Sequence, residues 1–194
     1  EILFYEFRNK LDMDCFKLHH YINTKYPREA MPVMYNTWMY KFQFIDFENV
    51  ENQIQAAKDL GIEYFVIDAA WFGQGNFWDA RGDWYENTQD AFRGRMAELS
   101  QLVRDNGMKF GFWLEIESAG FNAHVLKDHG DYYFTFNDHG KDLYFFDFAN
   151  EEARDYLMNT ICDQIDKYHI RFIKFDFNQD VEWDVHQSAF LNYF

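Results

Sequence analysis

Two helix-to-strand connections, each made through a single glycine, constrain the fold of this chain most. Apolar residues at helical spacing predict helices over residues 47–60 and 95–106. Gly61 and Gly107 follow them, at the position where a left-handed residue commonly ends a helix. An apolar run typical of a β-strand begins at once after each glycine. Tight helix-to-strand connections of this kind indicate repeated βα units and a parallel sheet.

The rest of the chain continues this order. A short strand at residues 1–7 and a helix at residues 12–23 precede Pro27 and Pro32, which mark a boundary. Beyond it, the predicted strands are residues 33–38, 62–68, 108–115 and 171–178, and the predicted helices are residues 47–60, 95–106 and 150–168. The loops after strands are long and the loops before strands are short, as in barrels whose active site is built from the loops after the strands.

We therefore predict an α/β fold of the TIM (β/α)8-barrel type. A doubly wound open sheet would share the loop asymmetry in part, but no glycine-rich phosphate fingerprint follows the first strand. A complete barrel needs eight βα units, typically in about 250 residues, so we expect residues 31–194 to form only the first half, about four units. Such a half barrel exposes a sheet edge, and we expect these 194 residues alone to show no turnover.

The fourth predicted strand carries the most informative polar residues. Residues 173–178 alternate, so that Lys174, Asp176 and Asn178 lie on one face. The other face is the apolar row Ile173, Phe175 and Phe177, which is predicted to pack against helices. Three polar groups at the carboxyl end of a strand are typical of the active-site end of a barrel enzyme. An edge strand with one solvent-exposed face shows the same pattern.

The other predicted strands also end in polar or aromatic residues. These residues are Asn36, Trp38, Asp68, Trp113 and Glu115. Carboxylates beside tryptophan, amide and ammonium groups suit a neutral, polyhydroxylated ligand, and glycoside hydrolysis requires two carboxyl groups. Asp176 is the best candidate for the nucleophile, because Lys174 on the same face would keep it ionised.

Composition excludes several functions. The net charge is −15 with no run of basic residues, so nucleic acid and anionic membranes are not expected partners. His19 and His20 have no acidic or cysteine partners at ligand spacing, and we expect no metal and no cofactor. Cys15 and Cys162 are expected to be buried free thiols, which favours a reducing, cytoplasmic location.

Four motifs resemble the melibiase-type α-galactosidases of glycoside hydrolase family 36. Their order and spacing agree over roughly residues 32–178. The motifs are Phe65-Val66-Ile67-Asp68-Ala69-Ala70-Trp71-Phe72-Gly73, Gly82-Asp83-Trp84, Gly107-Met108-Lys109-Phe110-Gly111-Phe112-Trp113-Leu114-Glu115, and Ile173-Lys174-Phe175-Asp176-Phe177-Asn178. The resemblance implies that residues 1–30 link an N-terminal β-sandwich domain to the barrel.

The resemblance also implies roles for single residues. Asp176 would be the nucleophile of a retaining mechanism acting on α-galactosides of the melibiose and raffinose type. Lys174, Asn178 and Asp68 would bind sugar hydroxyls, and Trp84 would wall the galactose pocket. The general acid/base of the family would lie beyond Phe194, and we expect the full-length protein to be a homo-oligomer.

The sequence departs from the family pattern at several positions. Ala69 and Ala70 stand in place of the second Asp and the Gly of the family's Asp-Asp-Gly-Trp motif, so one hydroxyl-binding carboxylate is missing. Ile116, Gln179 and Lys141 replace a proline and two arginines. These departures bear on which sugar is bound more than on the type of reaction.

The sequence is compatible with three functional hypotheses. The first is a retaining α-galactosidase, with α-N-acetylgalactosaminidase or galactosyl transfer as sister specificities that suit the missing aspartate. The second is a non-catalytic carbohydrate-binding relative, in which Asp176 only caps a strand end. The third is an α/β domain of unrelated function, in which the tryptophans are packing residues, as most residues inside barrels are.

Overall fold

The computed structural model describes residues 11–27 and 31–178. The chain divides into two compact units, Glu1–Pro32 and Val33–Phe194. The described part of the first unit contains the helix α1 (Leu11–Lys25), whose bounds are close to the predicted ones. The strand predicted at residues 1–7 lies outside the described residues.

The second unit is built on a parallel sheet of four strands, as predicted. The strands are β1 (Met34–Asn36), β2 (Tyr64–Ile67), β3 (Lys109–Leu114) and β7 (Phe172–Phe175). Their spatial order is β1-β2-β3-β7, with all three neighbouring pairs parallel. Each successive strand is therefore added at the same edge. A doubly wound sheet reverses direction instead, so this order is that of a (β/α)8 barrel.

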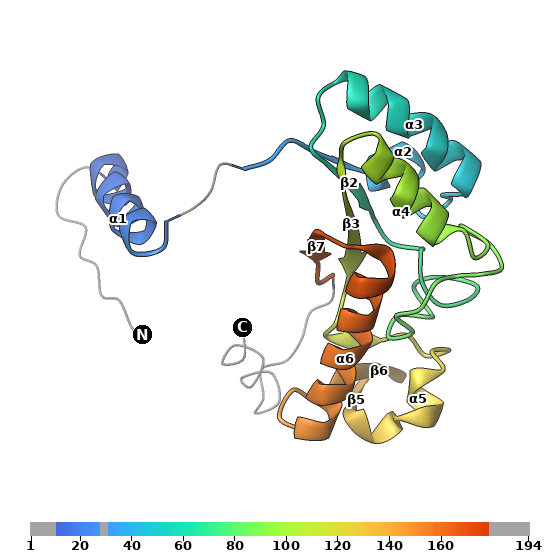
Figure 1. Ribbon diagram of the computed structural model, residues 1–194. Coiled ribbons are helices and arrows are strands. Elements are labelled where there is room, and N and C mark those ends of the chain that lie inside the picture. The colour runs from blue at the N-terminus through green and yellow to red at the C-terminus, as the bar shows by residue number, and fades with distance from the viewer. Residues whose placement is uncertain (1–10, 28–30, 179–194) are drawn as a thin grey trace. The chain divides into compact units, whose positions relative to one another are not determined.

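Three long helices lie along this sheet (Figure 1): α3 (Phe47–Asp59), α4 (Met96–Asp105) and α6 (Glu151–Tyr168). The side chain of Asp46 caps α3 by accepting from the backbone N–H of Asn49 at 2.8 Å. Gly61 and Gly107 adopt φ values of 73° and 80°, which confirms their predicted place at helix ends. Apolar stripes of the three helices and the outward-facing strand residues form one buried cluster.

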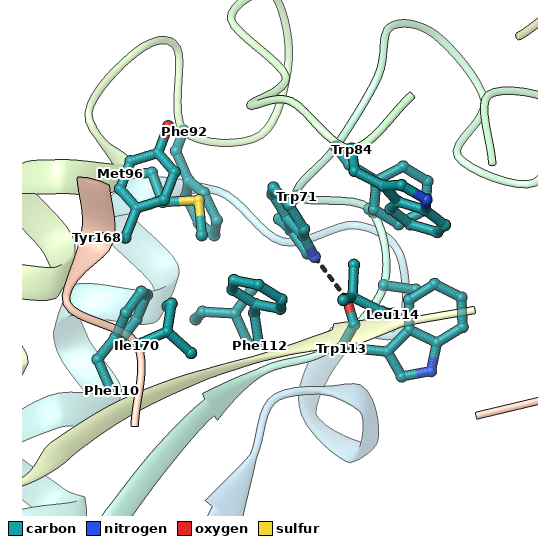
Figure 2. Packing of buried hydrophobic residues seen from close by; sticks show 14 of the residues in the cluster. Trp71, Trp84, Phe92, Met96, Phe110, Phe112, Trp113, Leu114, Tyr168 and Ile170 are labelled. Atoms are coloured by element: carbon teal, nitrogen blue, oxygen red, sulfur yellow. Dashed lines mark hydrogen bonds between the residues drawn. The ribbon is translucent and has the colours of Figure 1, made fainter. Parts of the chain in front are cut away.

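Figure 2 shows the part of this cluster that connects the loop after β2 to β3. The indole Nε1 of Trp71 donates a hydrogen bond to the backbone carbonyl of Trp113 at 2.8 Å. Trp71 is fully buried and its ring packs against Phe112, with centroids 4.8 Å apart. The loop after β2 is therefore held against the carboxyl end of β3 by the core.

A second, antiparallel sheet was not predicted. It follows β3 and consists of β4 (Ser118–Ala119), β5 (Tyr133–Asp138) and β6 (Lys141–Phe146), in the order β4-β6-β5. The short helices α2 (Trp38–Lys41), α5 (Val125–Asp128) and η1 (Gly130–Tyr132) were also missed. Elements of two to six residues carry too few periodic positions for a pattern to stand out.

Two packing expectations were wrong. Phe175 and Phe177 remain 48% and 37% exposed, because β7 is an edge strand of the described sheet, and only Ile173 of the apolar row packs on the core. Cys162 is exposed on α6 and Cys15 is half-buried, and both are free thiols. Within the described ranges, no helix combines the length and the apolar character that crossing a membrane requires.

Candidate active site

Lys174 joins two carboxylates at the carboxyl edge of the parallel sheet. Asp68 follows β2 directly and Asp176 follows β7 directly, so both lie at the same edge. The Nζ of Lys174 is 3.0 Å from Oδ2 of Asp68 and 3.2 Å from Oδ2 of Asp176. Burial lowers the pKa of Lys174, but its hydrogen bonds and ion pairs with the two aspartates outweigh that effect and leave the pKa raised. A permanent cation therefore sits between the two acids.

Asp68 is the more enclosed of these two acids, with 2% of its surface exposed. Its Oδ2 also accepts from the amide Nδ2 of Asn36 at 2.7 Å, and its Oδ1 accepts from the backbone N–H of Ala69 at 2.9 Å. The Asp68 backbone N–H donates to the hydroxyl of Thr37 at 2.9 Å. The carboxylate is thus fixed in place by hydrogen bonds from residues of β1 and β7.

Asp176 is more open, with about a third of its side chain (33%) exposed. Its Oδ2 accepts from the indole Nε1 of Trp113 at 3.1 Å, and its Oδ1 accepts from the backbone N–H of Phe177 at 3.1 Å. Partial burial raises the pKa of Asp176, but the hydrogen bonds from Trp113, Lys174 and Asn178 outweigh it and lower the pKa. An exposed carboxylate that stays ionised is suited to attack an electrophilic carbon.

A small cavity of about 140 Å³ opens over these groups. It is lined by Trp38, Asp68, Ala69, Phe77, Trp78, Trp113, Lys174, Asp176 and Asn178. The tertiary structure therefore brings together six predicted site residues, which are Trp38, Asp68, Trp113, Lys174, Asp176 and Asn178. Aromatic rings beside carboxylate, amide and ammonium groups can bind both the apolar faces and the hydroxyls of a sugar.

Two predicted site residues do not reach this cavity. Trp84 is 3% exposed and lies behind the cavity wall, with its ring 4.7 Å from Phe72 and 6.3 Å from Trp113. Glu115 has no exposed surface and forms a buried ion pair with Arg81, while the hydroxyl of Ser118 donates to it at 2.6 Å. In this structure both residues support the site from the core.

Sequence reasoning missed two aromatic residues of the cavity, Phe77 and Trp78. Both belong to the long loop after β2, whose richness in tryptophan was the one available signal. The guanidinium carbon of Arg81 lies 3.9 Å from the centre of the Trp78 ring, and its Nε donates to the Trp78 carbonyl at 3.1 Å. The buried pair of Arg81 and Glu115 therefore fixes one wall of the cavity.

Glu117 is a further acid near the site that sequence reasoning did not single out. It is 7% exposed, and within the described part of the chain its Oε2 has no hydrogen-bond partner. Burial raises its pKa to about 7, and the charges of Glu115 and Asp176 add to that effect. Among residues 11–27 and 31–178, no group of three metal-binding side chains is arranged to hold an ion.

The comparisons with known proteins agree on one family. The family model described as Melibiase matches residues 11–190. A bifunctional α-galactosidase/sucrose kinase from Mediterraneibacter gnavus is 29% identical over 175 residues, and the α-galactosidase Mel36A from Lactobacillus acidophilus is 26% identical over 187 residues. These matches cover 87% and 93% of this chain but only 18% and 25% of the relatives. The chain thus spans about a fifth to a quarter of their length.

Solved structures give the same result. The α-galactosidase from Lactobacillus brevis superposes with a TM-score of 0.73 at 27% identity, over 88% of this chain and 24% of that one. The α-galactosidase AgaA variant A355E from Geobacillus stearothermophilus, solved with 1-deoxygalactonojirimycin, superposes with a TM-score of 0.70 at 26% identity, over 79% and 22%. The fold is accordingly part of a TIM (β/α)8 barrel, as the strand order indicates.

Proposed function

Because the chain belongs to the melibiase family, we propose that it supplies the nucleophile and much of the sugar-binding wall of a retaining α-galactosidase. One observation carries this proposal: a single ammonium group, the Nζ of Lys174, contacts Asp68 and Asp176 at the carboxyl edge of the parallel sheet. That arrangement gives one enclosed carboxylate to hold hydroxyls and one open carboxylate to react.

In this mechanism Asp176 attacks the anomeric carbon and forms a covalent glycosyl intermediate, while the glycosidic bond breaks and the leaving alcohol takes a proton from the general acid. Water, deprotonated by the same group, then hydrolyses the intermediate and releases Asp176. Its lowered pKa keeps the attacking carboxylate ionised and makes it a good leaving group in the second step. Both steps therefore benefit from the donors Trp113 and Lys174. The retained configuration follows from the two successive displacements at the same carbon.

Asp68 is the proposed ligand of sugar hydroxyls, with Lys174 and Asn178 beside it. Its Oδ2 already accepts hydrogen bonds from the side chains of Lys174 and Asn36, which suits a binding role better than proton donation. Among the described residues that line the small cavity, Asp68 and Asp176 are the only acids. We therefore place the general acid/base outside this set, as the family resemblance implies.

The proposed substrates are α-galactosides such as melibiose- and raffinose-type oligosaccharides. A relative from Geobacillus stearothermophilus was solved with raffinose, at 26% identity and a TM-score of 0.67. A second specificity is supported by Ala69, which lines the small cavity where the family resemblance implies an aspartate. A site with one carboxylate fewer suits an α-N-acetylgalactosaminide or another galactose-like sugar. Cytoplasmic location and homo-oligomeric assembly of the full-length protein remain predictions.

The deciding experiment measures turnover of a nitrophenyl α-galactoside by the complete gene product and by its Asp176→Ala variant. We expect the variant to lose activity by a factor of about 10³ or more, and azide to restore part of it by replacing the missing nucleophile. Asp163→Ala, which removes an exposed carboxylate from α6, serves as the matched control. Binding of galactose without turnover by the parent protein would favour the non-catalytic carbohydrate-binding alternative.

A further inference from the structure

Trp78, on the long loop after β2, borders two cavities. One is the small cavity, which Asp68 and Asp176 also line. The other has a volume of about 30 Å³ and is lined by Trp78, Arg81, Gly120 and parts of β4 and β6. The Trp78 side chain is half-buried, so it can contact a ligand in the small cavity while other protein atoms hold it in place.

Arg81 contacts both the ring and the backbone of Trp78. The guanidinium carbon lies 3.9 Å from the ring centre, and the Nε donates to the Trp78 carbonyl at 3.1 Å. A planar guanidinium can stack on a ring and donate in its own plane at the same time, which a lysine ammonium group cannot do. Arg81 lines the 30 Å³ cavity and not the small one, so it orients the Trp78 ring from outside the small cavity.

Glu115 fixes Arg81 in turn. The two side chains form an ion pair in which Arg81 is 4% exposed and Glu115 has no exposed surface. The hydroxyl of Ser118 donates to the same carboxylate oxygen, Oε1, at 2.6 Å. Each charge would be buried without compensation if the other moved away, so the pair holds both side chains in one arrangement. Because Glu115 directly follows β3, the position of Trp78 is tied to the main sheet.

Gly120, directly after β4, holds the backbone of the same loop. Its N–H donates to the carbonyl of Arg81 at 2.9 Å, and the N–H of Asn122 donates to the carbonyl of Asp79 at 3.0 Å. A Cβ at position 120 would overlap the Asp79 carbonyl group and would lie 2.6 Å from the carbonyl oxygen of Trp78. The loop can therefore approach β4 this closely only because residue 120 is glycine.

We propose that Trp78 contacts the galactosyl unit in the small cavity, and that Arg81 is the positioning residue that sets the Trp78 ring. Glu115 acts through Arg81, and Gly120 acts through the loop backbone. This inference rests on the proposed function, because it places a galactosyl unit in the small cavity. An indole ring offers a flat apolar surface to the C–H groups of a sugar, and a ring that is already held in place loses less entropy on binding. Neither Trp78 nor Arg81 belongs to the motifs that carry the family resemblance.

The first test is a double-mutant cycle on the complete gene product, in which calorimetry measures the Kd of galactose. Trp78→Ala should raise the Kd about tenfold. Arg81→Lys keeps the charge opposite Glu115 but loses the stacked guanidinium and the Nε donor, and should raise the Kd about threefold. If Arg81 acts through Trp78, adding Arg81→Lys to Trp78→Ala changes the Kd no further. Effects that multiply would overturn the positioning role, and an unchanged Kd in Trp78→Ala would overturn the contact.

Two matched controls accompany the cycle. Arg95→Lys removes a guanidinium that lies 3.4 Å from the centre of the Phe47 ring, and neither residue lines the small cavity, so the Kd should not change. Gly120→Ala should raise the Kd because the added methyl group displaces the loop, whereas a Cβ at Gly130 meets no atom within 4 Å and Gly130→Ala should leave the Kd unchanged. Thermal unfolding shows which variants are folded, and an unchanged Kd in folded Gly120→Ala would overturn the part given to Gly120.

Kinetics separate this inference from the proposed function. With a nitrophenyl α-galactoside, Trp78→Ala and Arg81→Lys should raise KM and leave kcat within about twofold, because Asp176 keeps its donors Trp113 and Lys174. A parent protein that binds galactose without turnover contradicts the proposed function, and the Kd values then decide this inference by themselves. A parent protein that binds no galactose overturns the inference, whatever its turnover.

Discussion

The indole Nε1 of Trp113 donates a hydrogen bond to Oδ2 of Asp176 at 3.1 Å. The Trp113 ring is itself stacked on Phe72, with centroids 5.7 Å apart and planes inclined by 10°, and Trp84 packs edge-on behind both. The orientation of the candidate nucleophile is thus set by the buried aromatic core, part of which Figure 2 shows. Trp84 acts on the site through this packing.

Trp113→Phe tests the hydrogen bond alone, because phenylalanine keeps an aromatic ring and lacks the N–H donor. Loss of that donor raises the pKa of Asp176, which must be ionised to react. We expect the acidic limb of the pH profile of kcat/KM to move to higher pH. Trp78→Phe is the control, since Trp78 lines the cavity without bonding Asp176 in the described structure. Identical acidic limbs in both variants would argue against the role given to Trp113.

Lys174→Met removes the cation between the two acids. Without the ammonium group, the buried Asp68 loses one hydrogen-bond donor, and the cation that separated it from Asp176 is gone. We therefore expect a loss of about 1–3 kcal/mol in the free energy of unfolding. Turnover should fall by a factor of about 10² or more, because Asp176 loses the partner that lowers its pKa. Denaturant unfolding and initial rates check both effects. Lys127→Met, at an exposed position on α5, should change neither.

Trp84→Phe distinguishes a packing role from direct contact with the sugar. Because Trp84 is buried behind Trp113, we expect a loss of about 1–2 kcal/mol in the free energy of unfolding and a change in KM below about twofold. Thermal unfolding and steady-state kinetics measure the two quantities. A KM raised about tenfold with unchanged stability would restore the prediction that Trp84 walls the sugar pocket.

Glu117→Gln tests the buried acid near the site. The pKa of Glu117 is about 7 in the folded protein and about 4.3 in an unfolded chain. Between these values the folded state holds a proton that the unfolded state has lost, so stability falls as the pH rises from about 4 to 7. The total fall is on the order of 3 kcal/mol.

Glutamine resembles the protonated acid and cannot ionise, so this pH dependence should disappear in the variant. We expect Glu117→Gln to stabilise the protein at pH 8 and to have little effect at pH 4, as measured by denaturant midpoints. Glu51→Gln, at an exposed position on α3, is the control and should show the same small effect at both pH values. A parent protein whose stability does not change between the two pH values would contradict the raised pKa.

Much of the main sheet could be read from the sequence because its signals are local. Helical stripes, the glycines at positions 61 and 107, and the alternation of residues 173–178 each depend on neighbours only a few positions apart. The expected bounds of β2, β3 and α3 differ from the observed ones by at most two residues at either end. The antiparallel sheet was missed because its pairing depends on contacts between short segments.

The sequence by itself determined the parallel βα order, the family, and the presence of Asp68, Lys174 and Asp176 at strand ends, because chain periodicity and motif spacing carry that information. The tertiary structure decided which candidates meet. It placed Lys174 between two acids that are 108 residues apart in the numbering (176 − 68). In the folded chain Trp84 and Glu115 are buried in the core, whereas Phe77 and Trp78 line the small cavity. Such placements depend on side-chain packing across strands, which no local pattern encodes.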